Sequence, residues 1–495
     1  MQFNKDVFFK YRHQFELGNL TTESFHPRTL NLSSVLKENI EEAIGLLSEV
    51  DELALQSLKT YNQGIYQLYQ ACQDTLEDDG RVFIAGCGAT GRLALSVETL
   101  FREKFQSDQV ISFMAGGDYA LIKSIERFED NAEYGMRQLE ELGFKNGDLF
   151  VGITEGGETS FVIGATEKAS TLSQRQSWFL YCNPDEELLS IERSKNVLLN
   201  KKIQKLNLCV GSMAISGSTR MQATTVQMLA IGFSLLYQFN SKKEFDHAFY
   251  GLIDRMISRN WSFLKDFIQF EFEAVKKGVP VTYLSPDKLA IAILTDTTER
   301  SPTFSLNGFE KVDEANRCFV YLSINNEVNA KQAWRSLLQR DPRCLSWNDL
   351  NTQIDKEELY KFDISKNAKI RRAGKEISFE KMGKQILISC SAKKYAIEFE
   401  RDDLFEMHLS LKMGLNIQST LLMGLLERFE GNMMSYVRPS NFKLVNRAQR
   451  YIEYFLKREG VEVPEEKIIE LIFDHDSSQS SPVVISVLEK LGVFL

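Results

Sequence analysis

The sequence has few of the residues that build disulfides or metal sites. Its 495 residues include seven cysteines, scattered singly without a C-x-x-C pair, and five histidines, none at the spacing of metal ligands. Dispersed cysteines in a long chain favour reduced thiols, and a metal site is not expected. Four thiols lie in or beside apolar runs and are expected to be small core residues: Cys87, Cys182, Cys209 and Cys390.

Long apolar runs and excess positive charge are also missing. No run reaches the length of a membrane-spanning helix. Residues 1–13 have neither the apolar core nor the small-residue cleavage site of a signal peptide. The formal net charge is −9, and no basic stripe stands out, which argues against a nucleic-acid partner. We therefore expect a cytoplasmic protein with neither a membrane nor a nucleic-acid partner.

The stretch RVFIAGCGATGR, residues 81–92, is the most informative part of the chain. The apolar residues 82–85 predict a buried strand, residues 86–91 predict a small-residue turn, and the apolar spacing that follows predicts a helix. Backbone N–H groups and the positive end of the helix dipole can meet an anion there. Two alternatives stay open: the G-x-G-x-x-G spacing is typical of dinucleotide sites, and a plain tight turn would bind nothing.

Alternating patterns predict the fold class. Strands are expected at 82–85, 110–114, 149–154, 178–182 and 206–210, with helices at 93–104, 131–142 and 161–170 between them. This alternation indicates a doubly wound parallel sheet with helices on both faces. Helical patterns at 34–50 and 63–76 precede it.

The second half reads as a diverged duplicate of the first. A helical stretch at 243–278 is followed by strand patterns at 281–284, 318–323, 385–390 and 395–400, and by a long helix at 411–429. The pattern is weakest over 330–385. Residues 436–495 predict three or four short helices that cap the molecule.

Four loops leave the carboxyl ends of the first set of strands, where ligands bind in such sheets: 86–92, 115–118, 154–160 and 216–220. Three of them present glycine together with serine or threonine just before a helix. Ordinary N-capping would explain one such loop, but three together favour an oxyanion ligand. Arg92 and Arg220 would neutralise it, unless they are surface ion-pair residues.

Several segments carry a family resemblance. RVFIAGCGATGRLAL, LFVGITEGGETSFVIGA and ISGSTRMQATT resemble the sugar isomerase (SIS) domain of N-acetylmuramic acid 6-phosphate etherases, over roughly residues 26–240. They are also similar to the first SIS domain of glucokinase regulatory proteins. TDTTERSPTF at 295–304 resembles a segment of the second SIS domain of those regulators, and NMMSYVRPSNFKL at 432–444 resembles the opening of their C-terminal lid.

The resemblance implies an α/β fold with two doubly wound, flavodoxin-like SIS domains and a helical lid. The expected divisions are an N-terminal arm and helix at 1–45, a first SIS domain at 46–242, a second at 243–435 and the lid at 436–495. It also implies a phosphorylated sugar as ligand and no cofactor. The residues expected to bind it are Gly88, Ala89, Thr90, Gly91, Arg92, Gly116, Gly117, Thr154, Gly156, Thr159, Ser160, Ser216, Ser218, Thr219, Arg220 and Lys443.

The family's etherase chemistry implies two glutamates. One of them carries over to Glu129, but the other position falls on Leu100 in the first half. Glu98 is close in sequence but does not share a helix face with that position. In the second half Glu299 matches the lost position. We therefore expect one composite site, with Glu299 reaching in from the second domain; the alternative is that Glu299 caps a helix and the site only binds.

The activity expected from the resemblance is that of a carbon–oxygen lyase that releases D-lactate from N-acetylmuramic acid 6-phosphate. One carboxylate would remove a proton and the other would protonate the departing oxygen; by analogy with the family, Glu129 is the base and Glu299 the acid. A non-catalytic sugar-phosphate sensor with a sugar kinase partner is the main alternative, and a phosphosugar isomerase is the second. An oligomer is possible under each of these hypotheses.

Some positions depart from the etherase pattern. Gly156 and Glu158 replace a serine and an arginine of the family, and Gln222 replaces a lysine. Acids beside a phosphate cost electrostatic energy unless they point outward or meet sugar hydroxyls. Lys443 would restore positive charge, unless it is a solvated surface residue.

Overall fold

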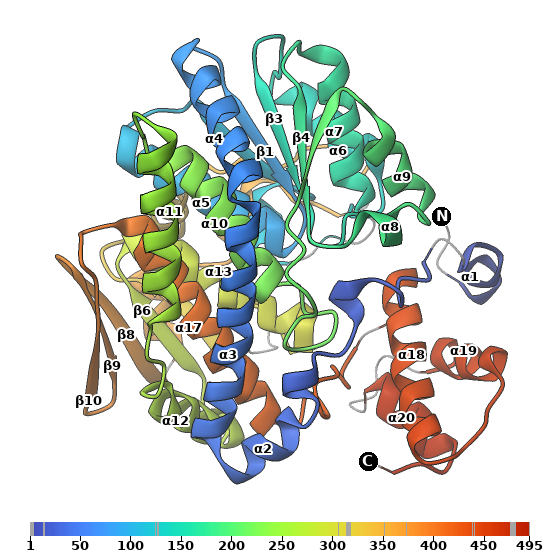
Figure 1. Cartoon of the computed structure of the whole chain (residues 1–495). Helices are drawn as coiled ribbons and strands as arrows, with labels where there is room; N and C mark the ends of the chain where they lie inside the picture. The colour runs from blue at the N-terminus through green and yellow to red at the C-terminus, as the bar shows by residue number, and fades with distance from the viewer. Residues whose placement is uncertain are drawn as a thin grey trace.

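The computed structural model describes residues 4–12, 15–123, 125, 128–304, 306–312, 318–350, 352–372, 374–437, 439, 441–475 and 482–494. The strands of these residues form two five-stranded sheets, with helices packed around and between them (Figure 1). The two α/β units expected from the alternating patterns are therefore present.

The first sheet is parallel throughout, in the order β2-β1-β3-β4-β5. This is the flavodoxin-like strand order. The central strands are buried along their whole length because helices cover both faces, which is why they read as apolar runs. The strands are β1 (Val82–Gly86), β2 (Val110–Met114), β3 (Leu149–Ile153), β4 (Ser177–Tyr181) and β5 (Ile203–Asn207).

The last strand of this sheet lies three residues earlier than the apolar run at 206–210 predicted. β5 is an edge strand, and Gln204 and Lys205 in it are only partly buried. An edge strand tolerates polar residues because one side faces solvent. The apolar run at 206–210 therefore covers only the end of β5 and the residues that follow it.

The second sheet is mixed rather than parallel throughout. β6, β7 and β8 are parallel, whereas β9 and β10 extend the sheet as an antiparallel edge, in the order β10-β9-β8-β6-β7. β9 buries alternate residues, as one-sided strands do, whereas in β10 at the edge of the sheet only Ile397 is buried. The strands are β6 (Val281–Ser285), β7 (Val320–Ile324), β8 (Lys375–Met382), β9 (Gln385–Cys390) and β10 (Lys393–Glu398).

The sequence did not predict β8. Its sequence, KEISFEKM, alternates charged residues with only a few apolar ones, and of its eight residues only Ile377 and Phe379 are buried. The charged residues interrupt the apolar run by which the other strands were predicted. Alternation of buried and exposed positions is itself a strand pattern, but it is short here.

The helices of the first half are α1 (Lys5–Tyr11), α2 (Leu32–Glu38), α3 (Ile40–Leu58), α4 (Asn62–Glu77), α5 (Ala89–Phe105), α6 (Ala132–Glu141), α7 (Ser160–Leu172), α8 (Asp185–Leu188), α9 (Glu192–Leu199) and α10 (Gln222–Leu236). Those of the second half are α11 (Lys242–Ile257), α12 (Leu264–Lys276), α13 (Asp287–Phe304), α14 (Ala330–Leu338), α15 (Lys356–Tyr360), α16 (Lys366–Arg371), α17 (Leu404–Leu425), α18 (Phe442–Arg458), α19 (Glu465–Phe473) and α20 (Val483–Lys490).

Two expected boundaries fall differently. The helical pattern at 34–50 is divided at Asn39, whose side chain caps α3 by accepting hydrogen bonds from the N–H groups of Glu41 and Glu42. The helix α3 then runs unbroken past residue 45, so no linker separates the N-terminal arm from the first α/β unit there.

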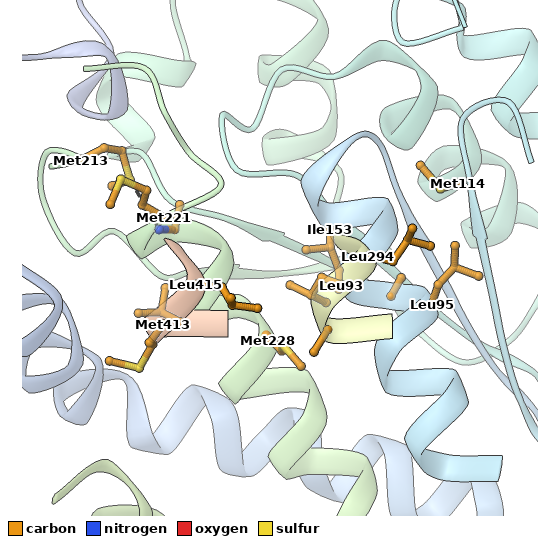
Figure 2. Packing of buried hydrophobic residues seen from close by; sticks show 14 of the residues in the cluster. Leu93, Leu95, Met114, Ile153, Met213, Met221, Met228, Leu294, Met413 and Leu415 are labelled. Carbon is orange, nitrogen blue, oxygen red and sulfur yellow. Dashed lines mark hydrogen bonds between the residues drawn. The ribbon is translucent and has the colours of Figure 1, made fainter. Parts of the chain in front are cut away.

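Helices α4, α5 and α10 lie on one side of the first sheet, and α6, α7 and α9 lie on the other (Figure 1). The helices α5 and α10 meet α13 and α17 of the second half. Figure 2 shows Leu294 of α13 beside Leu93 of α5 within the buried apolar cluster. The two halves therefore share one core, and the residues of α17 from Phe405 to Gly424 are all buried in it.

The C-terminal helices α18, α19 and α20 pack together below the first sheet, with α1 against them (Figure 1). The ring of Phe8 in α1 lies 5.6 Å from that of Phe442 and 5.9 Å from that of Phe473, between ring centroids. Within the described ranges, no helix has both the length and the apolar character needed to cross a membrane.

Candidate functional site

A cavity of about 200 Å³ lies at the carboxyl ends of the strands of the first sheet, where the topology places ligands. Four separate parts of the chain line it: the N-terminal arm, the loops of the first sheet, α13 of the second half, and the segment that enters α18. The expected site residues in this lining are Gly88, Ala89, Glu129, Gly156, Thr159, Ser218, Thr219, Arg220, Glu299 and Lys443.

Three helices begin at this cavity without a side-chain cap. Gly88 precedes α5, Thr159 precedes α7, and the loop through Arg220 leads into α10; in none of the three does the side chain at the N-cap position accept a hydrogen bond from the first turn. The N–H groups of a first turn have no partner within the helix. The residues at these three N-cap positions are therefore not ordinary side-chain caps. Some first-turn N–H groups have other partners: that of Phe161 donates to the carbonyl of Glu129 at 3.0 Å, and that of Ala223 lies 3.4 Å from Met213 Sδ. The remaining N–H groups of the helix ends can meet an anion.

Gly88 gives one of these loops its shape. Its φ of +54° is a conformation that side chains rarely adopt, and a Cβ added there would meet no heavy atom within 4 Å. Gly86 is different, because a Cβ would lie 2.4 Å from the backbone carbon of Thr90. Gly86 thus permits the tight return of the chain, while Gly88 leaves open space beside the cavity.

Two buried polar atoms of the cavity wall lack partners among the described residues: Ser218 Oγ and Arg220 Nε. The other guanidinium nitrogens of Arg220 are held in place. Nη1 lies 3.2 Å from Asp296 Oδ1, and Nη2 donates to Thr420 Oγ1 at 2.9 Å. An unpaired buried polar group costs free energy, and an oxyanion in the cavity would satisfy both atoms.

Other hydroxyls expected in the site serve its loops instead. Thr90 Oγ1 donates to the carbonyl of Cys87 at 2.9 Å and accepts from its N–H at 3.0 Å. Thr154 Oγ1 lies 3.0 Å from Thr159 Oγ1, and Ser216 Oγ donates to the carbonyl of Glu23 at 2.7 Å. Of these hydroxyl residues only Thr159 lines the cavity; Thr90, Thr154 and Ser216 do not, nor does Ser160.

The glycines expected on the second loop also lie outside the cavity. A Cβ on Gly117 would approach the carbonyl oxygen of Arg343 to 2.9 Å, and a Cβ on Gly116 would approach Ile125 to 2.8 Å. Gly91, on the first loop, packs α5 against Met114 of β2 in the same manner. These glycines permit close packing, and the loop at 115–118 contacts the second half rather than the ligand space.

Glu299 reaches the cavity from α13, as the composite-site hypothesis requires. Its carboxylate forms an ion pair with Arg92, whose residue is only 1% exposed. Arg92 also donates to the carbonyls of Leu121 at 3.2 Å and Ala120 at 3.1 Å. Arg92 therefore holds Glu299 instead of facing a ligand, and it is not a surface ion-pair residue.

Glu129 lines the same cavity, at the end of the loop that leads to α6. Burial raises the pKa of its carboxyl to about 6; Lys443 opposes this rise, and the neighbouring carboxylates of Glu158 and Asp130 add to it. A carboxyl with such a pKa can both accept and release a proton near neutral pH.

The acid that replaces the family arginine is neutralised. Glu158 is buried, and it accepts hydrogen bonds from Lys443 Nζ at 2.6 Å and from Arg193 Nη2 at 2.9 Å. Despite its burial, these two cations hold the pKa of Glu158 at about 2. Lys443 is therefore not a solvated surface residue: it contributes positive charge to the cavity and fixes the entry to α18.

Sequence reasoning missed the contribution of the N-terminal arm. Leu20, Thr22 and Glu23 line the cavity, and Glu23 binds Arg447 at 3.0 Å and Arg450 at 2.7 Å. No motif marks these residues, and the two arginines that bind Glu23 lie more than 400 positions away in the chain. Glu155 was also missed as a site residue, although it stands in the loop whose departure from the family pattern was visible.

No group of side chains suited to a metal ion occurs within the part of the chain that the structure describes. The partly buried Cys87 thiol lines the cavity as well, and burial together with the carboxylates of Glu129 and Glu155 raises its pKa well above the ordinary value. The cavity is therefore equipped with carboxyl groups, hydroxyls, cations and helix N-termini.

Comparison with known proteins agrees with this arrangement. A family model described as the glucokinase regulatory protein N-terminal SIS domain matches residues 65–170. An N-acetylmuramic acid 6-phosphate etherase from Pseudothermotoga lettingae is 32% identical over 217 residues, which cover 43% of this chain and 68% of that relative. The etherase from Francisella tularensis is 28% identical over 218 residues, covering 43% of this chain and 69% of that relative.

Among solved structures, the chain is similar to the tagatose-6-phosphate ketose/aldose isomerase from Escherichia coli. The sequence identity is 12% and the TM-score 0.35, with 52% of this chain and 64% of that chain covered. A similarity at this level adds nothing to the fold class, which the strand order already gives.

The strand order, the cavity and the matching family model define an SIS-domain protein with a function related to sugar phosphates. Within that class, the chain belongs to the N-acetylmuramic acid 6-phosphate etherase family. The matched region covers less than half of this chain.

Proposed function

We propose that the cavity binds a phosphorylated amino sugar and that the protein is a lyase resembling N-acetylmuramic acid 6-phosphate etherase, which releases D-lactate. One observation carries this proposal: three uncapped helix N-termini and two unpartnered polar atoms, Ser218 Oγ and Arg220 Nε, surround a cavity that also holds two glutamates on separate halves. The helix ends and the two polar atoms suit a phosphate, and the carboxyl groups that line the cavity suit proton transfer.

The phosphate would anchor the sugar at the helix ends, and this remote binding energy would position the reacting carbons. Glu129 would remove the proton next to the carbonyl of the open-chain sugar. A second carboxyl would deliver a proton to the departing lactyl oxygen. Division of acid and base roles between two carboxyls requires that their surroundings differ, and in this cavity they do.

The test is lactate release from N-acetylmuramic acid 6-phosphate by the purified protein. We expect release, and we expect Glu129→Gln to abolish it while N-acetylglucosamine 6-phosphate still raises the melting temperature, because a ligand of the folded state stabilises it by mass action. A protein that binds the sugar phosphate but releases no lactate would contradict the lyase function and leave sugar-phosphate binding in place.

A second candidate is a non-catalytic regulator that senses a sugar phosphate and inhibits a sugar kinase. The match of residues 65–170 to the glucokinase regulatory protein domain favours it. Stabilisation by fructose 6-phosphate but not by amino-sugar phosphates, in the same thermal-shift experiment, would support this candidate over the lyase.

A further inference from the structure

The cavity has more carboxyl groups than the reaction needs, and their partners separate them into two classes. Three are paired with cations: Glu23 with Arg447 and Arg450, Glu158 with Lys443 and Arg193, and Glu299 with Arg92. Among the described residues, no cation lies within ion-pair distance of the other two, Glu129 and Glu155. These two are therefore the carboxyls able to exchange protons.

Glu299 is unsuited to donate a proton. Its carboxylate is the only ion-pair partner that the described residues give to Arg92, and Arg92 is fully enclosed. Protonation of Glu299 would leave the guanidinium buried without its counter-charge, which is unfavourable. The ion pair thus holds Glu299 in its position on α13.

Glu155 has the opposite surroundings. It lies two residues after the end of β3, at the carboxyl edge of the sheet, and its backbone carbonyl accepts from the N–H of Cys182 at 2.9 Å. Its Oε1 lies 3.2 Å from the hydroxyl of Thr224, which itself donates to the carbonyl of Thr219 at 2.8 Å. This contact orients the carboxyl from the first turn of α10. Burial raises its pKa to about 7, and the carboxylates of Glu299 and Glu129 add to the rise while Lys443 opposes it.

We propose that Glu155 is the acid that protonates the departing lactyl oxygen, with Glu129 as the base and Glu299 as a positioning residue. This assignment rests on the proposed lyase function. It replaces the analogy in which Glu299 has the acid role, and it uses a residue that the family pattern does not supply at this position.

With these roles, the protons and electron pairs of the reaction balance. Glu129 takes the proton from C2, the C2 electron pair forms the C2–C3 double bond, and the C3–O bond breaks with its electron pair on oxygen. Glu155 gives its proton to that oxygen, and lactate leaves as the free alcohol. Water then adds to C3 and returns a proton to Glu155, while Glu129 returns its proton to C2. The net reaction consumes one water.

The decisive experiment compares two leaving groups in the variants Glu155→Gln, Glu129→Gln and Glu299→Gln. Lactate needs a proton to depart, whereas chloride in the 3-chloro-3-deoxy analogue of N-acetylglucosamine 6-phosphate does not. Because a general acid typically contributes about 10²–10⁴-fold, we expect Glu155→Gln to lower kcat for lactate release at least about 100-fold, with KM changed less than threefold. The same variant should eliminate chloride at close to the unchanged rate, whereas Glu129→Gln should lose both reactions.

Two controls complete the test. Glu192→Gln removes an exposed carboxylate on α9 and should leave both reactions unchanged. If Glu155→Gln does not fold, Thr224→Val removes the orienting hydroxyl and should lower kcat for lactate but not for chloride, while Thr224→Ser should restore it.

The outcomes are distinguishable. Lactate release by Glu155→Gln at the unchanged rate, or equal loss of both reactions in that variant, would overturn the assignment alone. Selective loss of lactate release in Glu299→Gln with chloride elimination retained would also overturn it, in favour of Glu299. Absence of lactate release from the unchanged protein at every pH would overturn the lyase function and the assignment together.

Discussion

At the scale of single residues, similar side chains in neighbouring positions have different tasks. Ser216 and Ser218 stand two residues apart in one loop and are both buried. Ser216 Oγ is bonded to a carbonyl of the N-terminal arm, whereas Ser218 Oγ has no partner among the described residues. The first hydroxyl therefore serves the fold, and the second is free to serve a ligand.

This difference predicts opposite effects of two alanine substitutions. Ser218→Ala should leave the free energy of unfolding nearly unchanged and weaken sugar-phosphate binding about 10- to 100-fold, because a hydrogen bond to a charged group contributes about 1.5–3 kcal/mol. Ser216→Ala should cost about 1–2 kcal/mol of stability because the carbonyl of Glu23 loses its partner. Urea unfolding and titration calorimetry with N-acetylglucosamine 6-phosphate measure both; equal effects on binding would contradict the division of tasks.

The two unpaired carboxyls predict a pH dependence of stability. Glu129 and Glu155 ionise in the folded state near pH 6 and 7, above the ordinary value of 4.5. Their burial penalty therefore lowers the free energy of unfolding above pH 7, and protonation removes the penalty as the pH falls toward 4.5. Each pKa unit corresponds to about 1.4 kcal/mol, so the combined effect is at most a few kcal/mol.

The measurement is urea unfolding between pH 5 and 8. Relative to the unchanged protein, the double variant Glu129→Gln with Glu155→Gln should gain stability as the pH rises through this window. Glu192→Gln is the control and should show a constant difference. A constant difference for the double variant would contradict the raised pKa values.

At the scale of elements, a buried ionic cluster connects the two halves. Glu98 of α5 and Asp118 of the neighbouring loop both bind Arg340, which follows α14; the distances are 3.0 Å to Glu98 Oε1 and 2.5 Å to Asp118 Oδ2. Burial by itself would raise the pKa of Glu98, but Arg340 and Arg343 hold that pKa at about 2. The loop at 115–118 is therefore a contact between the two halves.

Arg340→Met should destabilise the protein by about 3–5 kcal/mol, because it removes the cation that the described residues give to the buried Asp118 carboxylate and one of the cations around Glu98. The matched control is Lys265→Met, which removes a half-exposed ion pair with Glu41 at 2.8 Å and should cost less than about 1 kcal/mol. Urea unfolding compares them. Similar small costs for both substitutions would show that the cluster does not hold the halves together.

At the scale of the whole molecule, the cavity closes only where distant parts of the chain meet. The N-terminal arm, the first-sheet loops, α13 and the start of α18 each contribute to its wall. The lid is fastened by ion pairs that cross the molecule, from Lys443 to Glu158 and from Arg447 to Glu23. A ligand in the cavity would therefore stabilise all four parts together.

Hydrogen exchange tests this coupling. N-acetylglucosamine 6-phosphate should slow amide exchange in residues 20–23, 154–159, 299–303 and 441–447 at once, because ligand binding opposes local opening. The antiparallel edge of the second sheet, β9 and β10, lies outside the cavity lining and should be unaffected. Protection confined to the loops of the first sheet would contradict a composite site.

Much of the fold could be predicted from the sequence because buried parallel strands are nearly continuous apolar runs. β2 and β9 match their predicted ranges in full, and β1, β3 and β4 match within a residue. The prediction failed where strands carry charge on a solvent face, as β5 and β8 do. Those strands depend on their neighbours in the sheet, and a local pattern does not show the neighbours.

The site could be predicted in part for a related reason. Gly88, Thr159 and Ser218 stand in loops whose position follows from the alternation of strand and helix, and all three line the cavity. The sequence did not indicate that the loop at 115–118 faces the second half. Nor did it reveal the cation that holds Glu299, because Arg92 and Glu299 are 207 positions apart.

Local spacing of apolar, glycine and hydroxyl residues is enough to predict the strand–turn–helix units, the carboxyl edge at which they gather, and the family to which the chain belongs. Which carboxyls are held by cations and which are not became clear from the folded arrangement alone. That distinction depends on contacts between residues far apart in the chain and on burial, which lowers the dielectric response around each charge.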